Sequence, residues 1–294
     1  MNKYTYLFNQ YKSCAITDNQ VKEEVERIIS KNVDKNKTVE VYKTIFGLID
    51  LTSLNNTDTE SRIKALTEKV NKFSTNFEKI PNVAAICVYP SMVSTVKSTL
   101  TAQQINIASV AAGFPAPQTF LEVKIAETAM AVMEGATEID MVFPIDKFLE
   151  ENYEELSEEI MEIKTSCRGA KLKVILETGT LKTAENIAKA ALLSIASGAD
   201  FIKTSTGKAE VGATLEAAYT MCKVIKEFEE KNNTKIGIKI AGGVATIQNA
   251  VEYYTLIKEL LGKEFLNKEL FRIGASRLAN GLLSAIEEKE VKYF

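Results

Sequence analysis

The sequence contains no histidine and no tryptophan among its 294 residues. Without histidine there is no imidazole to act as a general base, to complete a Ser-His-Asp or Cys-His catalytic set, or to bind zinc in an HExxH motif. These three classes of enzyme are therefore excluded.

Positive charge is not in excess. The 36 Lys and Arg residues stand against 39 Asp and Glu residues, which gives a net charge of −3 and a pI near 5.5. A nucleic-acid-binding surface usually produces a basic excess, so we expect no nucleic-acid partner. No apolar run approaches the ~18 residues of a membrane-spanning helix, so we expect no membrane association.

Cysteine is scarce, and the N-terminal segment MNKYTYLFNQYKSC lacks the apolar core of a signal peptide. The four cysteines, at positions 14, 87, 167 and 222, show no CxxC spacing and no clustering. This pattern indicates free thiols in a reducing compartment rather than a disulfide scaffold. We therefore expect a cytoplasmic protein.

What the chain does contain is a repeated alternation of short apolar strands and longer amphipathic helices. Eight segments read as strands: Ile45–Thr52, Ala84–Pro90, Asn106–Pro115, Glu138–Pro144, Lys171–Gly179, Asp200–Gly207, Lys235–Gly243 and Leu270–Ser276. Between them, segments such as Glu122–Gly135 and Thr183–Ser197 carry apolar residues at helical spacing.

Such alternation predicts an α/β protein with a parallel sheet built from right-handed βαβ units. Eight units in about 250 residues match the size of a (β/α)8 TIM barrel. A doubly wound open sheet is the structural alternative, but it usually carries a glycine fingerprint after its first strand. Asp50–Asn55 contains no glycine.

The segment that precedes the first strand predicts an N-terminal helical extension over residues 1–43, with the barrel domain over residues 44–294. Thr17 or Asp18 would cap a helix through Val21–Ile29, whose apolar residues form one stripe. We expect Lys31–Thr38 to be a loop that links this helix to the barrel.

Strand alternation brings charged side chains to the inside of the predicted barrel. Lys203, Lys239 and Asp140 all fall on the inward face of their strands, opposite large apolar residues that suit the helix layer. Lys173 and Glu177 also face inward on the fifth strand, either as a buried ion pair or as charges that bias the cluster.

A lone strand lysine is most simply an edge residue or one whose ammonium reaches solvent. A closed barrel has no edge, however, and a buried lysine is unfavourable unless it is paired or neutral. Two such lysines beside an aspartate therefore indicate amine catalysis. Partial burial and a neighbouring ammonium both lower the pKa of a lysine, which makes its neutral, nucleophilic form available.

Small residues close the last two strands, at Ala241–Gly243 and Gly274–Ser276. Barrels often bind phosphate at these two loops through accessible backbone N–H groups, although tight turns alone would also explain single glycines. Thr204–Lys208 (TSTGK) adds hydroxyls and a cation on the neighbouring loop. It is not a P-loop, because it lacks the first glycine of that pattern.

Five motifs together closely resemble the deoxyribose-phosphate aldolase family. They are Asp50–Asn55 (DLTSLN), Glu138–Pro144 (EIDMVFP), Asp200–Lys208 (DFIKTSTGK), Gly237–Val244 (GIKIAGGV) and Phe271–Ser276 (FRIGAS). The resemblance extends from about residue 45 to residue 286 with all eight strands in order. It implies a class I aldolase on a (β/α)8 barrel.

The resemblance also implies roles for individual residues. Lys203 matches the Schiff-base lysine, Lys239 the second lysine that tunes it, and Asp140 the aspartate that moves protons through water. The positions that line the sugar site match Asp50, Thr52 and Leu54, and Cys87 matches a nearby cysteine that the family does not require for catalysis. The phosphate-binding set matches Gly207, Lys208, Gly242, Gly243 and Ser276, beside Thr204 and Gly274 of the same loops.

Three positions depart from the family pattern. Ile240 stands where the family usually has Pro, Ala245 where it has Arg, and Arg277 where it has a second Ser. The last two lie at the phosphate end, so phosphate affinity is the property that they affect. Tyr293 is a counterpart of the tail tyrosine that assists proton transfer in some members.

The expected reaction is reversible cleavage of 2-deoxy-D-ribose 5-phosphate to D-glyceraldehyde 3-phosphate and acetaldehyde, in deoxyribonucleotide catabolism. We expect no metal and no organic cofactor, and a homodimer is one possible assembly. Two alternatives remain: a transaldolase-like enzyme with another sugar phosphate, and a non-catalytic sugar-phosphate sensor. The complete set of Lys203, Lys239 and Asp140 argues against a sensor.

Overall fold

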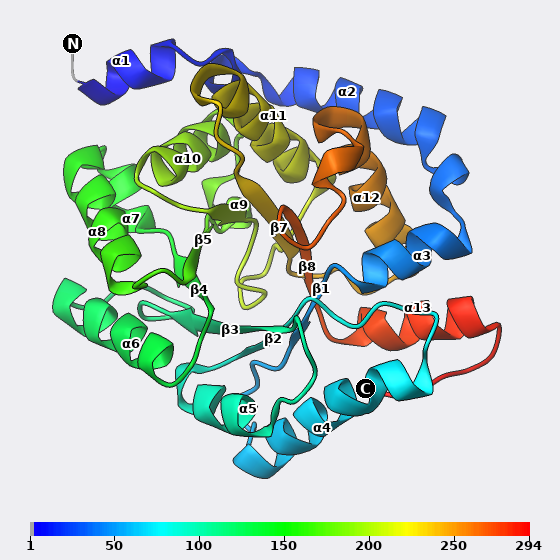
Figure 1. The fold of residues 1–294 in the computed structure, drawn as a ribbon. Helices are drawn as coiled ribbons and strands as arrows, with labels where there is room; N and C mark the ends of the chain where they lie inside the picture. Colours follow the sequence, from blue (N-terminus) through cyan, green and yellow to red (C-terminus); the bar gives the residue numbers. More distant parts are fainter. Residues whose placement is uncertain (1–2) are drawn as a thin grey trace.

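Eight parallel strands pair in sequence order, and β8 pairs back with β1 to close a barrel (Figure 1). The computed structural model describes residues 3–294. The strands are β1 Ile49–Thr52, β2 Ala85–Val88, β3 Asn106–Ala111, β4 Glu138–Val142, β5 Lys171–Ile175, β6 Phe201–Lys203, β7 Gly237–Ala241 and β8 Phe271–Ala275. The predicted (β/α)8 fold is confirmed, and the open sheet is excluded.

Helices form a ring around the barrel, as Figure 1 shows. They are α4 Glu60–Asn76, α5 Val93–Thr99, α6 Leu121–Met133, α7 Ile145–Leu149, α8 Tyr153–Ser166, α9 Thr178–Leu181, α10 Ala184–Ala196, α11 Leu215–Asn232, α12 Ile247–Leu261 and α13 Arg277–Glu287, with short 3-10 turns at η3 Pro90–Met92 and η4 Lys263–Phe265. Threonine hydroxyls cap several of them by accepting a hydrogen bond from a first-turn amide, at Thr59, Thr183, Thr214 and Thr246.

The strand register explains why charge gathers inside. Asp140 of β4 lies opposite Lys173 of β5, and Lys203 of β6 lies opposite Lys239 of β7. Paired residues of parallel strands point to the same side of a sheet. The alternate residues, such as Ile139 and Ile202, are fully buried in the apolar layer between strands and helices.

The start of the first predicted strand is wrong. Ile45 and Phe46 belong to helix α3 (Val39–Phe46), and β1 begins only at Ile49. Both side chains are fully buried, and Phe46 stacks on Phe73 with ring centroids 4.9 Å apart. A short apolar run fits a buried helix end as well as a strand, so periodicity could not separate the two.

The other predicted strands are correct in place but too long at their ends. The largest difference is at Asp200–Gly207, where β6 covers only Phe201–Lys203. The fifth strand ends at Ile175 instead of reaching the glycine at 179, because Glu177 adopts a left-handed backbone conformation and α9 follows. The residues beyond each strand form the loops at the carboxyl end of the barrel.

The N-terminal segment contains α1 (Lys3–Asn9), η1 (Lys12–Ala15), α2 (Asp18–Asn32) and η2 (Asp34–Asn36). Helix α2 packs outside the ring against α11 and α12 (Figure 1). Thr17 is its cap, in a reciprocal capping box with Gln20. The helix and the capping threonine agree with the sequence prediction.

The predicted loop over Lys31–Thr38 is wrong, because α2 continues to Asn32 and η2 follows directly. The side chain of Asn36 fixes this turn. Its nitrogen Nδ2 donates a hydrogen bond to Thr255 Oγ1 at 2.9 Å, and its oxygen Oδ1 accepts one from Lys258 Nζ at 2.8 Å. The division at residues 43 and 44 stays a prediction. Helix α3 spans that boundary, and α2 shares one buried apolar cluster with the barrel helices.

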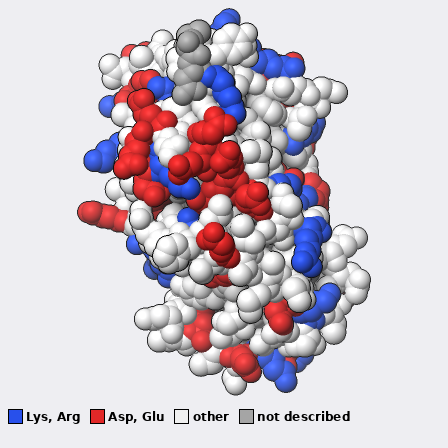
Figure 2. All heavy atoms as spheres, turned by 90° about the vertical axis from the view of Figure 1, so that its left-hand side faces the viewer, with Lys and Arg blue, Asp and Glu red and all other residues white. Residues whose placement is uncertain are grey.

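The outer face of α8 is acidic, as expected for a solvated helix. Figure 2 shows acidic side chains gathered on this side of the molecule. The exposed carboxylates of the region come from Glu150, Glu151, Glu154, Glu155, Glu158 and Glu162. Among the helices of residues 3–294, none is long and apolar enough to cross a membrane.

Candidate active site

Two lysines and one aspartate meet inside the barrel. Lys203 Nζ lies 2.8 Å from Asp140 Oδ2, and Lys239 Nζ lies 2.7 Å from the same oxygen. All three residues are at most 2% exposed. The structure therefore brings together the three predicted catalytic residues, each from a different strand.

A third lysine contacts the other oxygen of the same carboxylate. Lys173 Nζ lies 2.9 Å from Asp140 Oδ1 and 2.6 Å from Glu138 Oε2. The predicted alternative of a Lys173–Glu177 ion pair is wrong, because β5 ends before Glu177 and the chain turns away. Lys173 instead acts as a charge within the central cluster.

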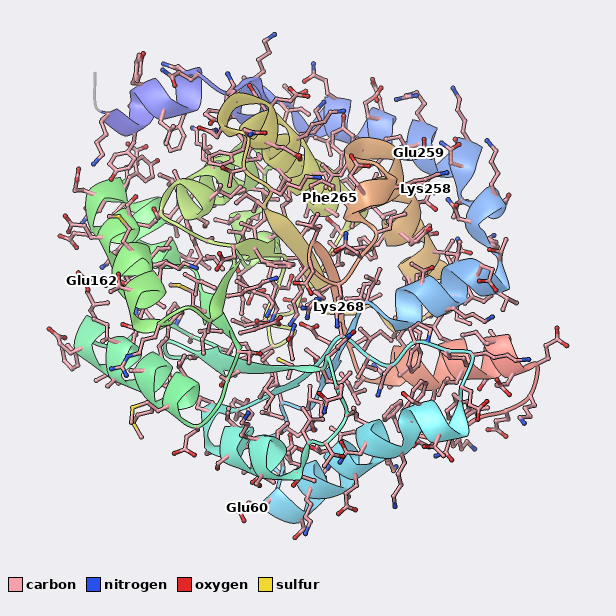
Figure 3. The ribbon with its side chains drawn as sticks, in the orientation of Figure 1. Glu60, Glu162, Lys258, Glu259, Phe265 and Lys268 are labelled. Carbon is pink, nitrogen blue, oxygen red and sulfur yellow. The ribbon has the colours of Figure 1, made fainter. Side chains whose placement is uncertain are left out.

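Arg272 completes the network, and the sequence analysis did not identify it. Its guanidinium donates to Asp50 Oδ1 at 2.6 Å, to Glu138 Oε1 at 2.7 Å and to the carbonyl oxygen of Lys268. Lys268 lies near the barrel axis in Figure 3 and precedes β8, so Arg272 occupies the amino-terminal end of the interior. Alternation in Phe271–Ala275, applied as for the other strands, would have shown the arginine facing inward.

The buried interior holds three carboxylates and four cations. They are Asp50, Glu138, Asp140, Lys173, Lys203, Lys239 and Arg272. If all were ionised, one positive charge would lack a counter-charge, which burial strongly disfavours. One amine is therefore favoured in its neutral form.

Local contacts select Lys203 as that amine. Burial lowers the pKa of Lys203 below its ordinary value; the Lys239 ammonium adds to this effect, while Asp140 opposes it. Burial also acts on Lys239, but the carboxylates of Asp140 and Asp50 outweigh it and raise the pKa of Lys239 well above its ordinary value. Lys239 Nζ lies only 2.5 Å from Asp50 Oδ2.

Asp140 is held as a carboxylate. Burial alone would raise its pKa, but the charges of Lys173 and Lys239, together with the hydrogen bond from Lys203, lower the pKa of Asp140 well below its ordinary value. In the same way, Lys173 has a raised pKa because Asp140 and Glu138 outweigh its burial. Lys203 is thus the lysine of the cluster whose pKa is lowered.

A cavity of about 690 Å³ opens above the cluster at the carboxyl ends of the strands. Most of the predicted site residues line it: Thr52, Leu54, Lys203, Gly207, Lys208, Lys239, Gly242, Gly243, Gly274 and Ser276. Residues that the prediction of the site did not include also line it, among them Arg62, Lys69, Asn280 and Phe294. Arg277 and Ala245, two of the departures from the family pattern, lie on the same wall.

Four predicted site residues lie outside the cavity lining. Asp140 and Asp50 are fully buried within the ion-pair network. Cys87 packs in a small apolar cluster with Leu54, and burial raises the pKa of its thiol. Thr204 Oγ1 donates to the Ala241 carbonyl at 2.8 Å and accepts from the Ala241 amide at 2.9 Å, so this hydroxyl joins β6 to β7. Substrate contact by Thr204 stays a prediction.

The glycines of the cavity wall are required by geometry at two points. Gly243 has φ +88°, a conformation that disfavours side chains, and a Cβ atom there would extend into open space. A Cβ atom on Gly274 would lie 2.9 Å from Ala241 Cβ and 3.3 Å from Lys239 Cε. These residues leave backbone groups accessible at the carboxyl ends of β7 and β8.

The hydroxyl of the tail residue Tyr293 is bonded to helix α4. It donates to the Lys69 carbonyl at 2.7 Å and accepts from Asn76 Nδ2 at 3.1 Å. Phe294, not Tyr293, lines the cavity. In this arrangement the Tyr293 hydroxyl is bonded to α4 and not to the lysine–aspartate cluster, and its role in proton transfer stays a prediction.

Within residues 3–294, no group of three or more acidic or thiol side chains is arranged to hold a metal ion.

A buried lysine pair beneath a cavity lined by glycines and cations is the arrangement expected of a barrel aldolase, a class of carbon–carbon lyases. Residues 44–259 match the model of the DeoC/LacD family aldolases. The chain belongs to this family, and the predicted resemblance to deoxyribose-phosphate aldolase and the assignment as a lyase are confirmed.

Curated relatives of the chain are named for one particular activity of this family. The human deoxyribose-phosphate aldolase is 43% identical over 244 residues, covering 80% of this chain and 77% of that protein. The mouse enzyme of the same name is 41% identical over 251 residues, with coverage of 82% and 78%. A solved deoxyribose-phosphate aldolase from Aeropyrum pernix, described as a tetramer, shares the fold with a TM-score of 0.67 at 24% identity, over 88% of this chain and 96% of that one.

Proposed function

We propose that the protein reversibly cleaves 2-deoxy-D-ribose 5-phosphate to D-glyceraldehyde 3-phosphate and acetaldehyde through a Schiff base on Lys203. The observation that carries this proposal is the difference in contacts between two neighbouring buried lysines: Lys239 lies against the carboxylates of both Asp140 and Asp50, whereas Lys203 contacts Asp140 alone, through an oxygen that it shares with Lys239. Both lysines line the cavity. Burial and the Lys239 ammonium lower the pKa of Lys203, which favours its neutral, nucleophilic form over that of Lys239.

In the first half of the reaction, neutral Lys203 Nζ attacks the C1 aldehyde and forms a carbinolamine. Loss of water gives an iminium cation, which accepts the electron pair of the C2–C3 bond when a base removes the C3 hydroxyl proton. D-Glyceraldehyde 3-phosphate leaves, and an enamine remains on Lys203. Protonation of the enamine carbon and hydrolysis then release acetaldehyde and restore the amine.

Asp140 and Lys239 serve as the proton relay in this scheme, with water between them and the substrate. Asp140 Oδ2 contacts both amines, at 2.8 Å and 2.7 Å, so a proton can pass between them through one carboxylate oxygen. Because its pKa is held low, Asp140 also remains negative beside the cationic iminium and stabilises it.

The phosphate is proposed to lie between the loops at Gly242–Gly243 and Gly274–Ser276. Helix α13 begins directly after Ser276, and its first-turn amides have no side-chain cap, so they can donate to an anion. Lys208 spans the cavity mouth, where its ammonium donates to the Leu54 carbonyl at 2.6 Å. Arg277 lines the same wall and is proposed to supply the cation that the family has at Ala245.

Borohydride trapping tests the covalent step. Acetaldehyde plus borohydride should add a two-carbon label to Lys203, found by peptide mass mapping. A Lys64→Arg variant, changed at an exposed lysine of α4, should label normally. Labelling mainly at Lys239, or absence of label in active protein, would contradict the proposal. Binding of the sugar phosphate without any label would instead indicate the sensor, and cleavage only of another sugar phosphate a transaldolase-like enzyme.

The setting of the enzyme is proposed on separate grounds. All four cysteines are free and buried, which fits a reducing cytoplasm. The predicted homodimer stays a prediction, and size measurement in solution would test it.

A further inference from the structure

Glu177 is a buried carboxylate that the proposed reaction does not use. It follows β5, is 6% exposed, and has φ +52° and ψ +58°. A residue with a side chain rarely adopts this left-handed conformation, so the surrounding structure must hold it there. Backbone hydrogen bonds do so on each side, from Leu176 N to Lys203 O at 2.8 Å and from Thr178 N to Thr204 O at 3.0 Å.

The carboxylate of Glu177 points at the loop that follows β6. Within residues 3–294, its hydrogen-bond donors all come from Thr206: the hydroxyl at 2.5 Å and the backbone amide at 3.3 and 3.4 Å. No lysine of the central cluster contributes. Glu177 therefore fixes both the main chain and the side chain of one loop residue.

Thr206 passes this constraint to the cavity wall. Because its hydroxyl proton is donated to Glu177, its oxygen is oriented to accept from Lys208 N, at 3.1 Å. This bond closes the turn around Gly207, which has φ +76°. Gly207 and Lys208 both line the cavity at the proposed phosphate site.

We propose that Glu177 is a positioning residue that holds the Thr206–Lys208 turn in the geometry that binds the phosphate of the substrate. This inference rests on the proposed function. Burying a carboxylate against a hydroxyl and an amide is unfavourable unless those bonds are fully made, so the turn has one strongly preferred arrangement. The barrel itself does not depend on the carboxylate, because the backbone bonds of Leu176 and Thr178 join β5 to β6 without it.

The test compares two pairs of variants. Glu177→Ala removes the acceptor, whereas Glu177→Gln keeps an amide oxygen that can accept from Thr206. Thr206→Val removes the hydroxyl, whereas Thr206→Ser keeps it. We expect the Ala and Val variants to raise KM for 2-deoxyribose 5-phosphate about 10-fold or more, in proportion to the loss of a hydrogen bond to a charged group.

In the Glu177→Gln and Thr206→Ser variants, KM for 2-deoxyribose 5-phosphate should stay within about 3-fold of the wild-type value. The double variant Glu177→Ala/Thr206→Val should be no worse than the worse single variant, because both changes break the same contact. Activity on unphosphorylated 2-deoxyribose and acetaldehyde labelling of Lys203 should stay near the wild-type level in all of them.

Equal losses on both sugars, or loss of labelling at Lys203, would show that Glu177 only supports the barrel and would overturn the proposal. An unchanged KM would overturn it as well. Hydrogen exchange of residues 206–208 gives an answer that does not depend on the reaction. Their amides should exchange faster in the Ala and Val variants than in the Gln and Ser variants. If the wild type neither labels nor cleaves, the proposed function fails, while the exchange result still decides whether Glu177 positions the turn.

Discussion

Replacing Lys239 with leucine tests the coupling between the two catalytic lysines. Lys203 Nζ and Lys239 Nζ lie 2.8 Å and 2.7 Å from the same oxygen of Asp140, so the two nitrogens are at most 5.5 Å apart. Two unit charges at that distance repel by about 3 kcal/mol at an effective dielectric constant of about 20. That energy corresponds to a factor of about 100 in an equilibrium constant.

Removal of the Lys239 charge should therefore raise the pKa of Lys203. Asp140 acts in the same direction. Without the Lys239 ammonium, its carboxylate interacts more strongly with Lys203 and raises the pKa of Lys203 further. The neutral fraction of Lys203 near neutrality should fall about 100-fold. Imine formation should slow accordingly, and the limb of the pH profile that reports deprotonation of Lys203 should move to higher pH.

The assay is the initial rate of borohydride-trapped label at Lys203, measured with acetaldehyde across a pH series. Lys239→Arg is the matched control, since it keeps a positive charge at this position and should keep the limb near its wild-type position. The fold should survive the Leu change, because Asp50 keeps Arg272, and Asp140 keeps both Lys173 and Lys203. An unchanged rate and pH profile in folded Lys239→Leu protein would refute the coupling.

Further changes separate the other groups of the site. Lys203→Arg should abolish labelling and turnover, because a guanidinium is not nucleophilic near neutrality; retained turnover would show that another amine forms the imine. Asp140→Asn should still form the imine but lower kcat by about 10²–10⁴-fold, the usual contribution of general acid–base catalysis, and rapid-quench trapping would reveal whether chemistry after imine formation is slowed. Gly243→Leu should raise KM for the phosphorylated sugar far more than for 2-deoxyribose; equal changes would place the phosphate elsewhere. Arg277→Ser should weaken binding of the phosphorylated sugar by about 1.5–3 kcal/mol if the guanidinium bonds the phosphate, whereas an unchanged KM would show that it points outward.

Strand alternation was enough to predict the centre of the site. Lys203, Lys239 and Asp140 each occupy the middle or end of a short strand whose alternate residues are large and apolar, and in a closed barrel only one side of such a strand faces inward. The pairing between those residues could not be predicted in the same way. It depends on the stagger between neighbouring strands, which brings Lys173 of β5 within reach of Glu138 of β4, and on the end of β5 at Ile175, which takes Glu177 away from Lys173.

The errors fall where local sequence is ambiguous or where conformation breaks a pattern. Ile45 and Phe46 suit either a helix or a strand, and only tertiary packing, such as the stacking of Phe46 on Phe73, decides between the two. Glu177 was placed on a strand because alternation continues through it, yet its left-handed backbone ends that alternation. A positive φ at a glutamate leaves no signal in a single sequence.

The charge balance of the interior favours Lys203, rather than its neighbours, as the proposed reactive amine. Arg272 and Lys173 are each held between two carboxylates, and Lys239 contacts both Asp140 and Asp50. Lys203 contacts Asp140 alone, through an oxygen that it shares with Lys239. The excess positive charge is therefore most easily relieved by loss of its proton. Removing any one of the three carboxylates would leave a second amine without a counter-charge, and removing a cation would let Lys203 keep its proton. The proposed reactivity at the cavity floor thus depends in part on side chains that do not line the cavity, such as Arg272, and changes at that residue should alter the pH dependence of the enzyme as well as its stability.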